Sequence, residues 1–262
     1  MIKVENIDKA FDDNHVLNDI SVVFEPGKTN VIIGTSGSGK TVFMKCLIGL
    51  YEVDSGSIFY HDVEFSHLNN KERKKIRKQI GMLFQGNALF DSMNVKDNII
   101  FPLNMFTKLS DREKLERVNF CLDRVNLSGA GNLFPAELSG GMKKRVGIAR
   151  AIVQNPKYLF CDEPNSCLDP QSAIVIDNLI KEITEEYNIT TVVNTHDMNS
   201  VMEIGDHIIY LNEGEKWWEG SNVEVLTSDN PELQSFIFAS DFIKQAIINP
   251  DNPDESDDNK PK

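Results

Sequence analysis

The chain has 262 residues, 40% hydrophobic and 26% charged, which is typical of a globular protein with one large domain. Its formal net charge of −13 argues against a general nucleic-acid binder, because a polyphosphate backbone attracts net positive surface. No apolar run approaches the roughly 20 residues of a membrane-spanning helix, and no secretion signal opens the sequence. We therefore expect a cytoplasmic protein without a nucleic-acid partner.

The first forty residues predict antiparallel strands followed by a buried strand, "TNVIIG". That strand runs into "GTSGSGKT", residues 34–41, which fits G-x-x-x-x-G-K-T between a strand and a helix. In such a loop backbone N–H groups wrap phosphates, the lysine reaches the β- and γ-phosphates, and the threonine hydroxyl binds Mg²⁺. The predicted ATP-binding residues are Gly34, Thr35, Ser36, Gly37, Ser38, Gly39, Lys40, Thr41 and Val42, with Thr41 also on the metal.

The middle of the chain is predicted to be mainly helical. Residues 69–79 form a basic helix candidate with a solvated face, and the strand "IGMLFQ" follows. Residues 94–134 are rich in helical patterns, with a capping box that starts at Ser110 and ends at Glu113. We expect an inserted helical subdomain over about 86–140.

A second phosphate-binding element is predicted in "AELSGGMKKRVGIARA", residues 136–151. Its small-residue turn, Ser139, Gly140 and Gly141, stands at the start of a basic helix. Such a helix end offers unpaired N–H groups and the positive end of the helix dipole to an anion.

Polar side chains end three predicted strands. "KYLFCDE" ends in two acids that must point opposite ways, so we assign Asp162 to Mg²⁺ and Glu163 to the attacking water as general base, a role worth about 10²- to 10⁴-fold in rate. Gln85 ends "MLFQ" and His196 ends "VVNTH". Between "KYLFCDE" and "VVNTH" a helix is predicted from Pro170 through Tyr187. Strands alternating with helices predict a mainly parallel, doubly wound α/β sheet, at whose carboxyl edge these groups would surround one γ-phosphate.

Taken in order, these motifs resemble the ATP-binding cassette (ABC) ATPases over roughly residues 2–225. "LSGGM" is similar to the family signature, Gln85 to its Q-loop glutamine, "SCLD" to its D-loop, and His196 to its switch histidine. The resemblance implies a P-loop NTPase fold with an antiparallel β subdomain, and ATP and Mg²⁺ as cofactors.

The resemblance also implies a homodimer packed head to tail, with ATP between the phosphate loop of one subunit and the signature of the other. The residues it assigns are Phe11 and Val16 at adenine, Gln85 at Mg²⁺ as well as at the water, and Ser139, Gly140, Gly141 and Asp169 at the partner's nucleotide. Where the family commonly has "DEPTSGLD", this chain has "DEPNSCLD"; we interpret Cys167 as a small buried thiol in place of glycine.

A resemblance to one subfamily predicts the class of substrate. "LFQGNALFDSMNV" and the methionine after "LSGG" are similar to the ATPases of Mce-type (Mla) lipid transporters. This likeness implies phospholipid transport between two bacterial membranes, with a separate permease and an Mce-domain protein as partners, and a place on the cytoplasmic face of the inner membrane. A small regulatory protein could bind the helical subdomain. The apolar residues of segment 81–103, which leads into that subdomain, either form a docking surface for the permease or pack inside the subdomain.

Two alternatives stay open at this point. One is the ATPase of a small-solute importer of the amino-acid type. The other is an ABC ATPase acting on a cytosolic scaffold, as in iron–sulfur cluster assembly, because "GGMKKR" has some likeness to that group.

The end of the chain is predicted to lie outside the catalytic domain, which we place at residues 1–228. Apolar residues at helical spacing predict a C-terminal helix over 229–248, followed by an acidic disordered tail over 249–262. In the hairpin before it, Trp217 and Trp218 are adjacent, so we expect at least one to be exposed.

Overall fold

The computed structural model describes residues 1–86 and 88–238. Within them a six-stranded sheet has the order β10-β9-β3-β8-β7-β6. Its neighbours are parallel except for the terminal hairpin of β9 and β10. The strands are β3 (Thr29–Ile33), β6 (Ile80–Leu83), β7 (Tyr158–Asp162), β8 (Thr190–Asn194), β9 (His207–Asn212) and β10 (Glu215–Gly220).

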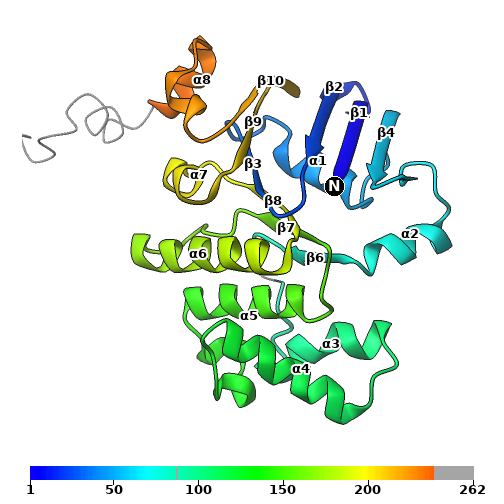
Figure 1. The fold of residues 1–262 in the computed structure, drawn as a ribbon, viewed down its shortest axis with the longest axis vertical. Coiled ribbons are helices and arrows are strands. Elements are labelled where there is room, and N and C mark those ends of the chain that lie inside the picture. Colours follow the sequence, from blue (N-terminus) through cyan, green and yellow to red (C-terminus); the bar gives the residue numbers. More distant parts are fainter. Residues whose placement is uncertain (87, 239–262) are drawn as a thin grey trace, which may run out of the picture.

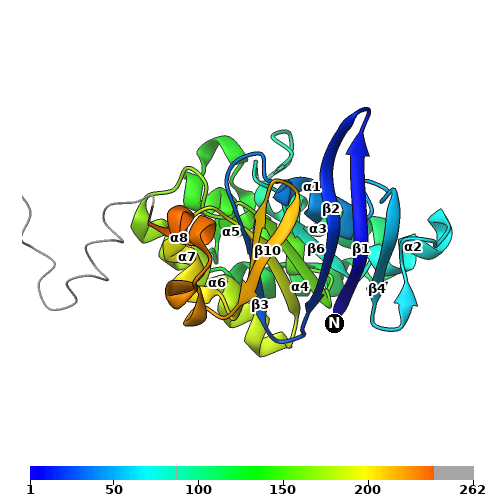
Figure 2. The same cartoon turned by 90° about the horizontal axis from the view of Figure 1, so that it is seen from above.

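A second, antiparallel sheet stands beside the first, with the order β2-β1-β4-β5 (Figure 2). Its strands are β1 (Ile2–Phe11), β2 (Asn14–Phe24), β4 (Ser55–Tyr60) and β5 (Val63–Glu64). Helix α1 (Lys40–Leu47) shares one hydrophobic core with both sheets, because Phe43 and Met44 are fully buried among residues of β1, β2 and β7. The helix that follows the phosphate loop is thereby held firmly between two sheets.

Buried strands of the parallel sheet face two different cores. In β7, Leu159 and Cys161 belong to one apolar cluster, whereas Tyr158 and Phe160 belong to the other. Side chains of a strand alternate between the two faces of a sheet, so a strand covered on both faces has a continuous apolar sequence. This explains the unbroken "YLFC" run and confirms the predicted α/β fold with a mainly parallel sheet.

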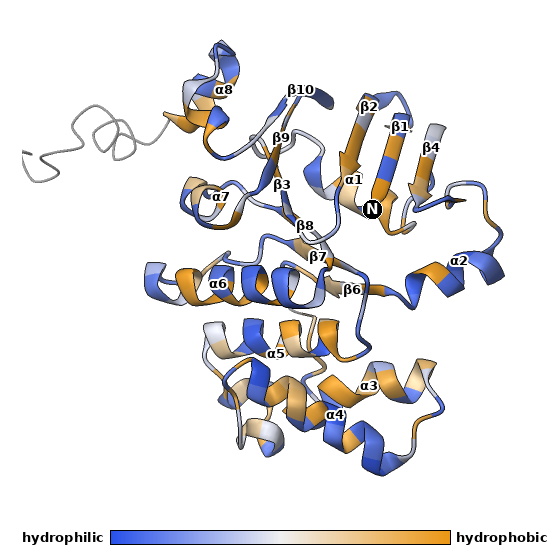
Figure 3. Cartoon of the chain, in the orientation of Figure 1, coloured by the Kyte–Doolittle hydropathy of each residue, from blue (hydrophilic) through white to orange (hydrophobic). Residues whose placement is uncertain are grey.

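Helices cover the sheet and extend from its β6 side. Figure 1 shows α3, α4 and α5 stacked at the end of the molecule opposite the β9–β10 hairpin, with α6 between them and the sheet. Helix α2 is drawn mostly in the blue of hydrophilic residues in Figure 3, as its basic sequence predicts. The helices are α2 (Asn70–Arg77), α3 (Val95–Phe106), α4 (Asp111–Arg124), α5 (Gly140–Ile152), α6 (Pro170–Tyr187), α7 (Met198–Ile204) and α8 (Pro231–Ile237).

Several local predictions hold at the level of single residues. The capping box of α4 is present: Ser110 N donates to Glu113 Oε2 at 2.7 Å, and Glu113 N donates to Ser110 Oγ at 3.4 Å. Helix α6 begins at Pro170 and ends at Tyr187, as predicted. Helix α7 was not predicted, because its seven residues are too few to show helical periodicity.

The expectation for the two tryptophans is wrong. Trp217 and Trp218 are both half-buried and both pack against the larger core. The register of β10 against β9 shifts between Lys216 and Trp218, which marks a β-bulge. A bulge interrupts the strict alternation of side chains, so two adjacent residues can approach the same core.

The C-terminal helix is described only in part. Helix α8 covers seven residues of the predicted 229–248 helix, and it buries Leu233 and Ile237. Residues 239–262, which include the remainder of that helix and the acidic tail, lie outside the described residues. In the described part of the chain no helix combines the length and apolar character needed to cross a bilayer.

Candidate nucleotide-binding site

The phosphate loop follows β3 directly and is shaped by glycines in conformations that other residues avoid. Gly34 has φ 151°, and a Cβ atom there would lie 2.2 Å from the carbonyl oxygen of Leu211. Gly39, the N-cap of α1, has φ 99°, and its Cβ would lie 2.9 Å from the carbonyl oxygen of Val16. A side chain at either position would force this loop away from its packed neighbours.

Lys40 is folded into the loop that it follows. Its ammonium Nζ donates to the carbonyl oxygens of Gly34 at 2.7 Å and Thr35 at 2.9 Å. The residue is only 8% exposed, and burial lowers the pKa of its amine. Because loop carbonyls already hold this cation at the centre of the loop, an incoming phosphate meets a positive charge that is already in place.

Two oxygen-bearing side chains converge beside the loop. Thr41 Oγ1 donates to Asp162 Oδ1 at 3.3 Å, and Asn194 Nδ2 donates to the same carboxylate oxygen at 3.1 Å. Mg²⁺ prefers oxygen ligands and is commonly held by one or two protein groups together with phosphate oxygens and water. The pair of Thr41 and Asp162 fits that requirement, with Asn194 orienting the carboxylate.

Glu163 is the first residue after strand β7, which ends at Asp162. Its φ of 50° lies in the left-handed region, and its N–H donates to Asn194 O at 2.9 Å. This turn directs the Glu163 carboxylate away from the Asp162 side of the strand. His196 Nδ1 lies 2.9 Å from the Glu163 carboxylate; the histidine side chain is 67% exposed and that of Glu163 only 13%.

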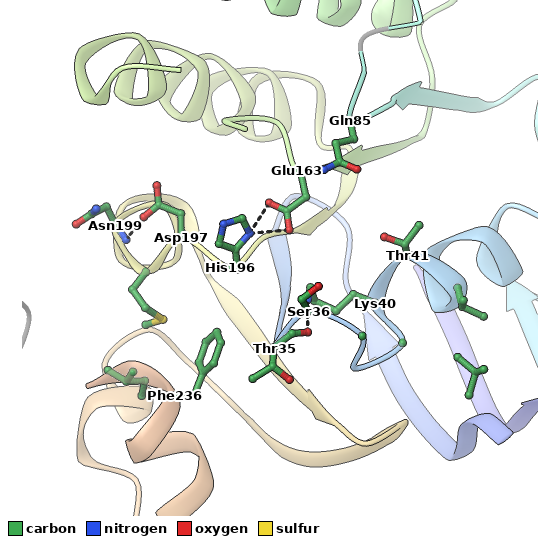
Figure 4. A pocket seen from close by; sticks show the side chains of 16 residues that line it. Thr35, Ser36, Lys40, Thr41, Gln85, Glu163, His196, Asp197, Asn199 and Phe236 are labelled. Atoms are coloured by element: carbon green, nitrogen blue, oxygen red, sulfur yellow. Dashed lines mark hydrogen bonds and ion pairs between the residues drawn. The ribbon is translucent and has the colours of Figure 1, made fainter. Parts of the chain in front are cut away.

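Many of the predicted groups line one cavity of about 930 Å³ (Figure 4), whereas Gly34, Ser38 and Asp162 are not among its lining residues. Glu163, His196 and Gln85 approach it from one side, and Lys40 and Thr41 from the other. The predicted residues that line it are Val16, Thr35, Ser36, Gly37, Gly39, Lys40, Thr41, Val42, Gln85, Glu163 and His196.

The signature residues lie elsewhere on the same chain. Ser139 is the N-cap of α5 and accepts from Met142 N at 3.2 Å, and neither it nor Gly140 or Gly141 lines the cavity. Asp169 caps α6 through Ser172 N at 2.9 Å, and the hydrogen bond from the Ser172 hydroxyl lowers the pKa of its carboxyl group. Neither of these two helix starts lines the cavity of its own chain.

Phe11 also stays away from the cavity lining. Its ring packs edge-on against Tyr51, with centroids 5.1 Å apart, and Lys9 Nζ lies 5.2 Å from its ring centre. The ring is 39% exposed, so a face remains open to a ligand. Its role at adenine stays a prediction.

Sequence reasoning missed several residues at the site. Asn194 was not singled out, although it bridges Asp162 and the Glu163 backbone. Phe236 and Ile237 of α8 line the cavity, as do Asp197, Met198 and Asn199. No short motif predicts Phe236 and Ile237, because helix α8 reaches the site through tertiary packing, which includes the contact of Phe236 with Tyr210.

The D-loop departs from expectation at Cys167. The thiol is exposed, which corrects our interpretation of a buried one, and the residue has φ 63°. The left-handed conformation explains why glycine is common at this position of the family, since glycine adopts it without strain.

Asn165, which directly precedes the "SCLD" segment, belongs to a buried polar cluster with Ser200 and Asp177. Asn165 Nδ2 donates to Ser200 Oγ at 2.9 Å and links the D-loop to α7. Burial raises the pKa of Asp177 to about 6; hydrogen bonds from Ser200 and Asn165 oppose the shift, and the charges of Asp197 and Glu203 add to it. The folded protein therefore favours the protonated form of this carboxyl group.

We predict that Asp177→Asn flattens part of the pH dependence of stability. The folded-state pKa lies above the unfolded value near 4, so the stability contributed by protonated Asp177 is fully present below about pH 4 and lost as the pH rises through about 6. The free energy of unfolding of the variant relative to wild type should rise by about 2–3 kcal/mol between pH 4 and pH 7. Urea titrations at both pH values measure this difference, and an unchanged difference would contradict the assignment.

Comparison with known proteins agrees with this geometry. A model of the ABC transporter family matches residues 17–166. The chain is 36% identical over 265 residues to the methionine import ATP-binding protein MetN of Campylobacter jejuni, covering 95% of this chain and 79% of that one. It is 37% identical over 236 residues to the probable ribonucleotide transport ATP-binding protein mkl of Mycobacterium leprae, covering 90% and 68%.

Solved structures show the same architecture. CbiO1 from Clostridium perfringens, part of the ABC transporter complex cbiONQ, matches with a TM-score of 0.82 and 29% identity over 96% of each chain. The ATP-binding cassette MJ0796, a dimer bound to ADP and phosphate, matches with a TM-score of 0.78 and 31% identity over 85% of this chain and 99% of that one.

The chain therefore belongs to the ABC transporter family, as an ATP-binding subunit. It is an ATPase whose cofactors are ATP and Mg²⁺. The relatives named above are described as methionine import and ribonucleotide transport proteins, so they do not single out the Mla or Mce-type lipid transporters.

Proposed function

We propose that two copies of this chain pair head to tail and hydrolyse two ATP molecules at their interface. The observation that carries the proposal is the division of the phosphate-binding groups. Six residues of the phosphate loop line the cavity: Thr35, Ser36, Gly37, Gly39, Lys40 and Thr41. Ser139, Gly140 and Gly141 instead stand at the start of the 13-residue helix α5 outside it, with Ser139 and Gly140 exposed. A second chain can present its α5 N-terminus to the phosphates, as the dimeric state of the cassette MJ0796 supports.

Within each site we assign separate tasks to the converging side chains. Lys40 binds the β- and γ-phosphates, and Thr41 with Asp162 holds Mg²⁺, which supplies charge neutralisation at the phosphates. Glu163 orients and deprotonates the attacking water. His196, hydrogen-bonded to Glu163, positions its carboxylate, and Gln85 reaches the water and the metal from the same side of the cavity as Glu163.

We further propose that hydrolysis drives a separate membrane permease, with the chain bound at the cytoplasmic face of the membrane. The segment from β6 to the start of α3 has residues suited to internal packing and others suited to permease docking. Val95 is buried and Leu89 packs on the core, whereas Phe84 and Phe90 are exposed. Exposed aromatic side chains of this kind are suited to anchor a protein partner.

The first candidate cargo is a small solute of the amino-acid type. The support is the 36–38% identity, over 95% of this chain, to proteins named for methionine import. Phospholipid transport with an Mce-domain partner is the second candidate, supported by the likeness of "LFQGNALFDSMNV" and Met142 to the Mce-type ATPases.

Purification from gently solubilised native membranes separates these candidates. The chain is isolated with its partners, which are identified together with bound lipids by mass spectrometry. A permease with a soluble solute-binding protein is the expected result for the first candidate. An Mce-domain protein and co-purified phospholipid would instead support the second, and scaffold proteins without any membrane protein would contradict the transport proposal.

A further inference from the structure

Lys144 lies one turn inside α5 and is only 3% exposed. Its Nζ donates to the carbonyl oxygen of Gln85 at 2.9 Å, to that of Glu163 at 3.2 Å and to Ser166 Oγ at 3.2 Å. A lysine ammonium has three N–H donors, so all three are used.

The three acceptors come from separate segments that meet at the candidate site. Gln85 follows β6, Glu163 follows β7, and Ser166 belongs to the D-loop. The cost of burying an ammonium group lowers the pKa of Lys144, while the charges of Glu163 and Asp162 act in the opposite direction. Such a burial is tolerated where each donor has a partner, and it fixes the positions of those partners.

Neighbouring cations of α5 do not share this arrangement. Arg145 donates to the carbonyl oxygens of Val125 and Asn126, at the end of α4. Lys143 is half-buried, and within residues 1–86 and 88–238 its side chain makes no hydrogen bond with Gln85, Glu163 or Ser166. The contact with Gln85 and Glu163 is therefore a property of Lys144 rather than of a generally basic helix.

We propose that Lys144 is a positioning residue that couples the signature helix to the hydrolytic groups of its own subunit. The inference rests on the proposed function above. Ser139–Gly141 at the start of α5 would contact the partner's nucleotide, and Lys144 on the same rigid helix holds the backbones that carry Gln85 and Glu163. A nucleotide in one site thus acts through α5 on the groups that hydrolyse ATP in the other.

The test compares steady-state ATP hydrolysis by full-length Lys144→Met, Lys144→Gln and the matched control Lys143→Met. Methionine keeps most of the length of the side chain and removes every donor, and glutamine restores two N–H donors. We expect Lys144→Met to lower kcat about 30-fold while KM for Mg-ATP stays within about threefold, since the bound nucleotide touches other groups. Lys144→Gln should retain kcat within about fivefold of wild type, and Lys143→Met within about twofold.

Thermal melting and a parallel Glu163→Gln variant make the outcome decisive. A kcat for Lys144→Met within twofold of wild type would overturn the inference. So would an equal loss of kcat, nucleotide affinity and melting temperature in the methionine and glutamine variants, because that pattern marks a purely structural lysine. If Glu163→Gln itself retains turnover, the proposed site fails rather than the role of Lys144 alone. If Lys144→Met does not fold, Lys144→Gln decides: a kcat within about fivefold of wild type supports the inference, and a larger loss of kcat at an unchanged melting temperature overturns it.

Discussion

Glu163→Gln is expected to lower kcat for ATP hydrolysis by about 10²- to 10⁴-fold while ATP binding persists. The amide has nearly the same shape but cannot accept the proton of the attacking water. Glu163 is well placed for that role, since its carboxylate is largely shielded, lines the cavity and contacts His196 at 2.9 Å. Phosphate release assays give kcat, and gel filtration with Mg-ATP shows whether the ATP-bound dimer accumulates.

Glu182→Gln is a matched control for this change. Glu182 lies on α6 and pairs with Arg124 at 3.1 Å on the surface, so the same substitution there should leave turnover within about twofold. Turnover by Glu163→Gln close to that of wild type would show that another group activates the water.

Lys40→Ala is expected to weaken ATP binding by about 100-fold or more, which corresponds to roughly 2.7 kcal/mol. The substitution removes the one cation that the loop carbonyls of Gly34 and Thr35 hold within the phosphate loop, and a charge-assisted contact to phosphate is among the strong hydrogen bonds. Titration with a fluorescent ATP analogue measures the dissociation constant.

Lys45→Ala provides the comparison on the same helix. Lys45 lies in the last turn of α1, and its Nζ is 5.4 Å from the ring centre of Tyr51, away from the phosphate loop. Its removal should change nucleotide affinity by less than about threefold. Equal losses in both variants would point to damage to α1 instead of a lost phosphate contact.

The fold was predictable where local patterns and tertiary packing agree. The sequence from Pro170 to Tyr187 predicted α6, and the apolar "YLFC" predicted a buried strand of the parallel sheet. The short α7 and the bulge at Trp217 have no such local signature. Their conformations are set by packing on the core, which a one-dimensional pattern does not contain.

The phosphate and metal groups were predictable for a chemical reason. Phosphate binding requires backbone N–H groups, a lysine and a hydroxyl at fixed spacing, and residues 34–41 provide them at that spacing. Lys144 donates hydrogen bonds to residues that lie 19 to 59 positions away in the sequence. Asn194 donates to Asp162, which is 32 positions away. Such contacts depend on how strand ends are brought together and carry no motif.

The cargo was the least predictable property. The residues whose chemical role is evident from the sequence all bind or hydrolyse ATP. A cargo that is recognised by a separate permease leaves no equivalent pattern in this chain. The likeness that favoured phospholipid covers short segments, whereas the identity to the methionine import proteins extends over 95% of the chain.

The head-to-tail pairing of two chains is tested most directly by mixing two inactive variants. Lys40→Ala disables the phosphate loop. Gly140→Asp places a negative charge at the exposed start of α5, where an acid favours the helix but repels the partner's phosphates.

Each variant alone should be inactive. An equal mixture should recover a measurable part of the wild-type ATPase activity, with about a quarter as the upper limit. Half of the dimers are mixed and one of their two sites is intact, and the disabled second site cannot act through α5 on the intact one. No recovery in the mixture, or full activity of Gly140→Asp alone, would contradict a site shared between two subunits.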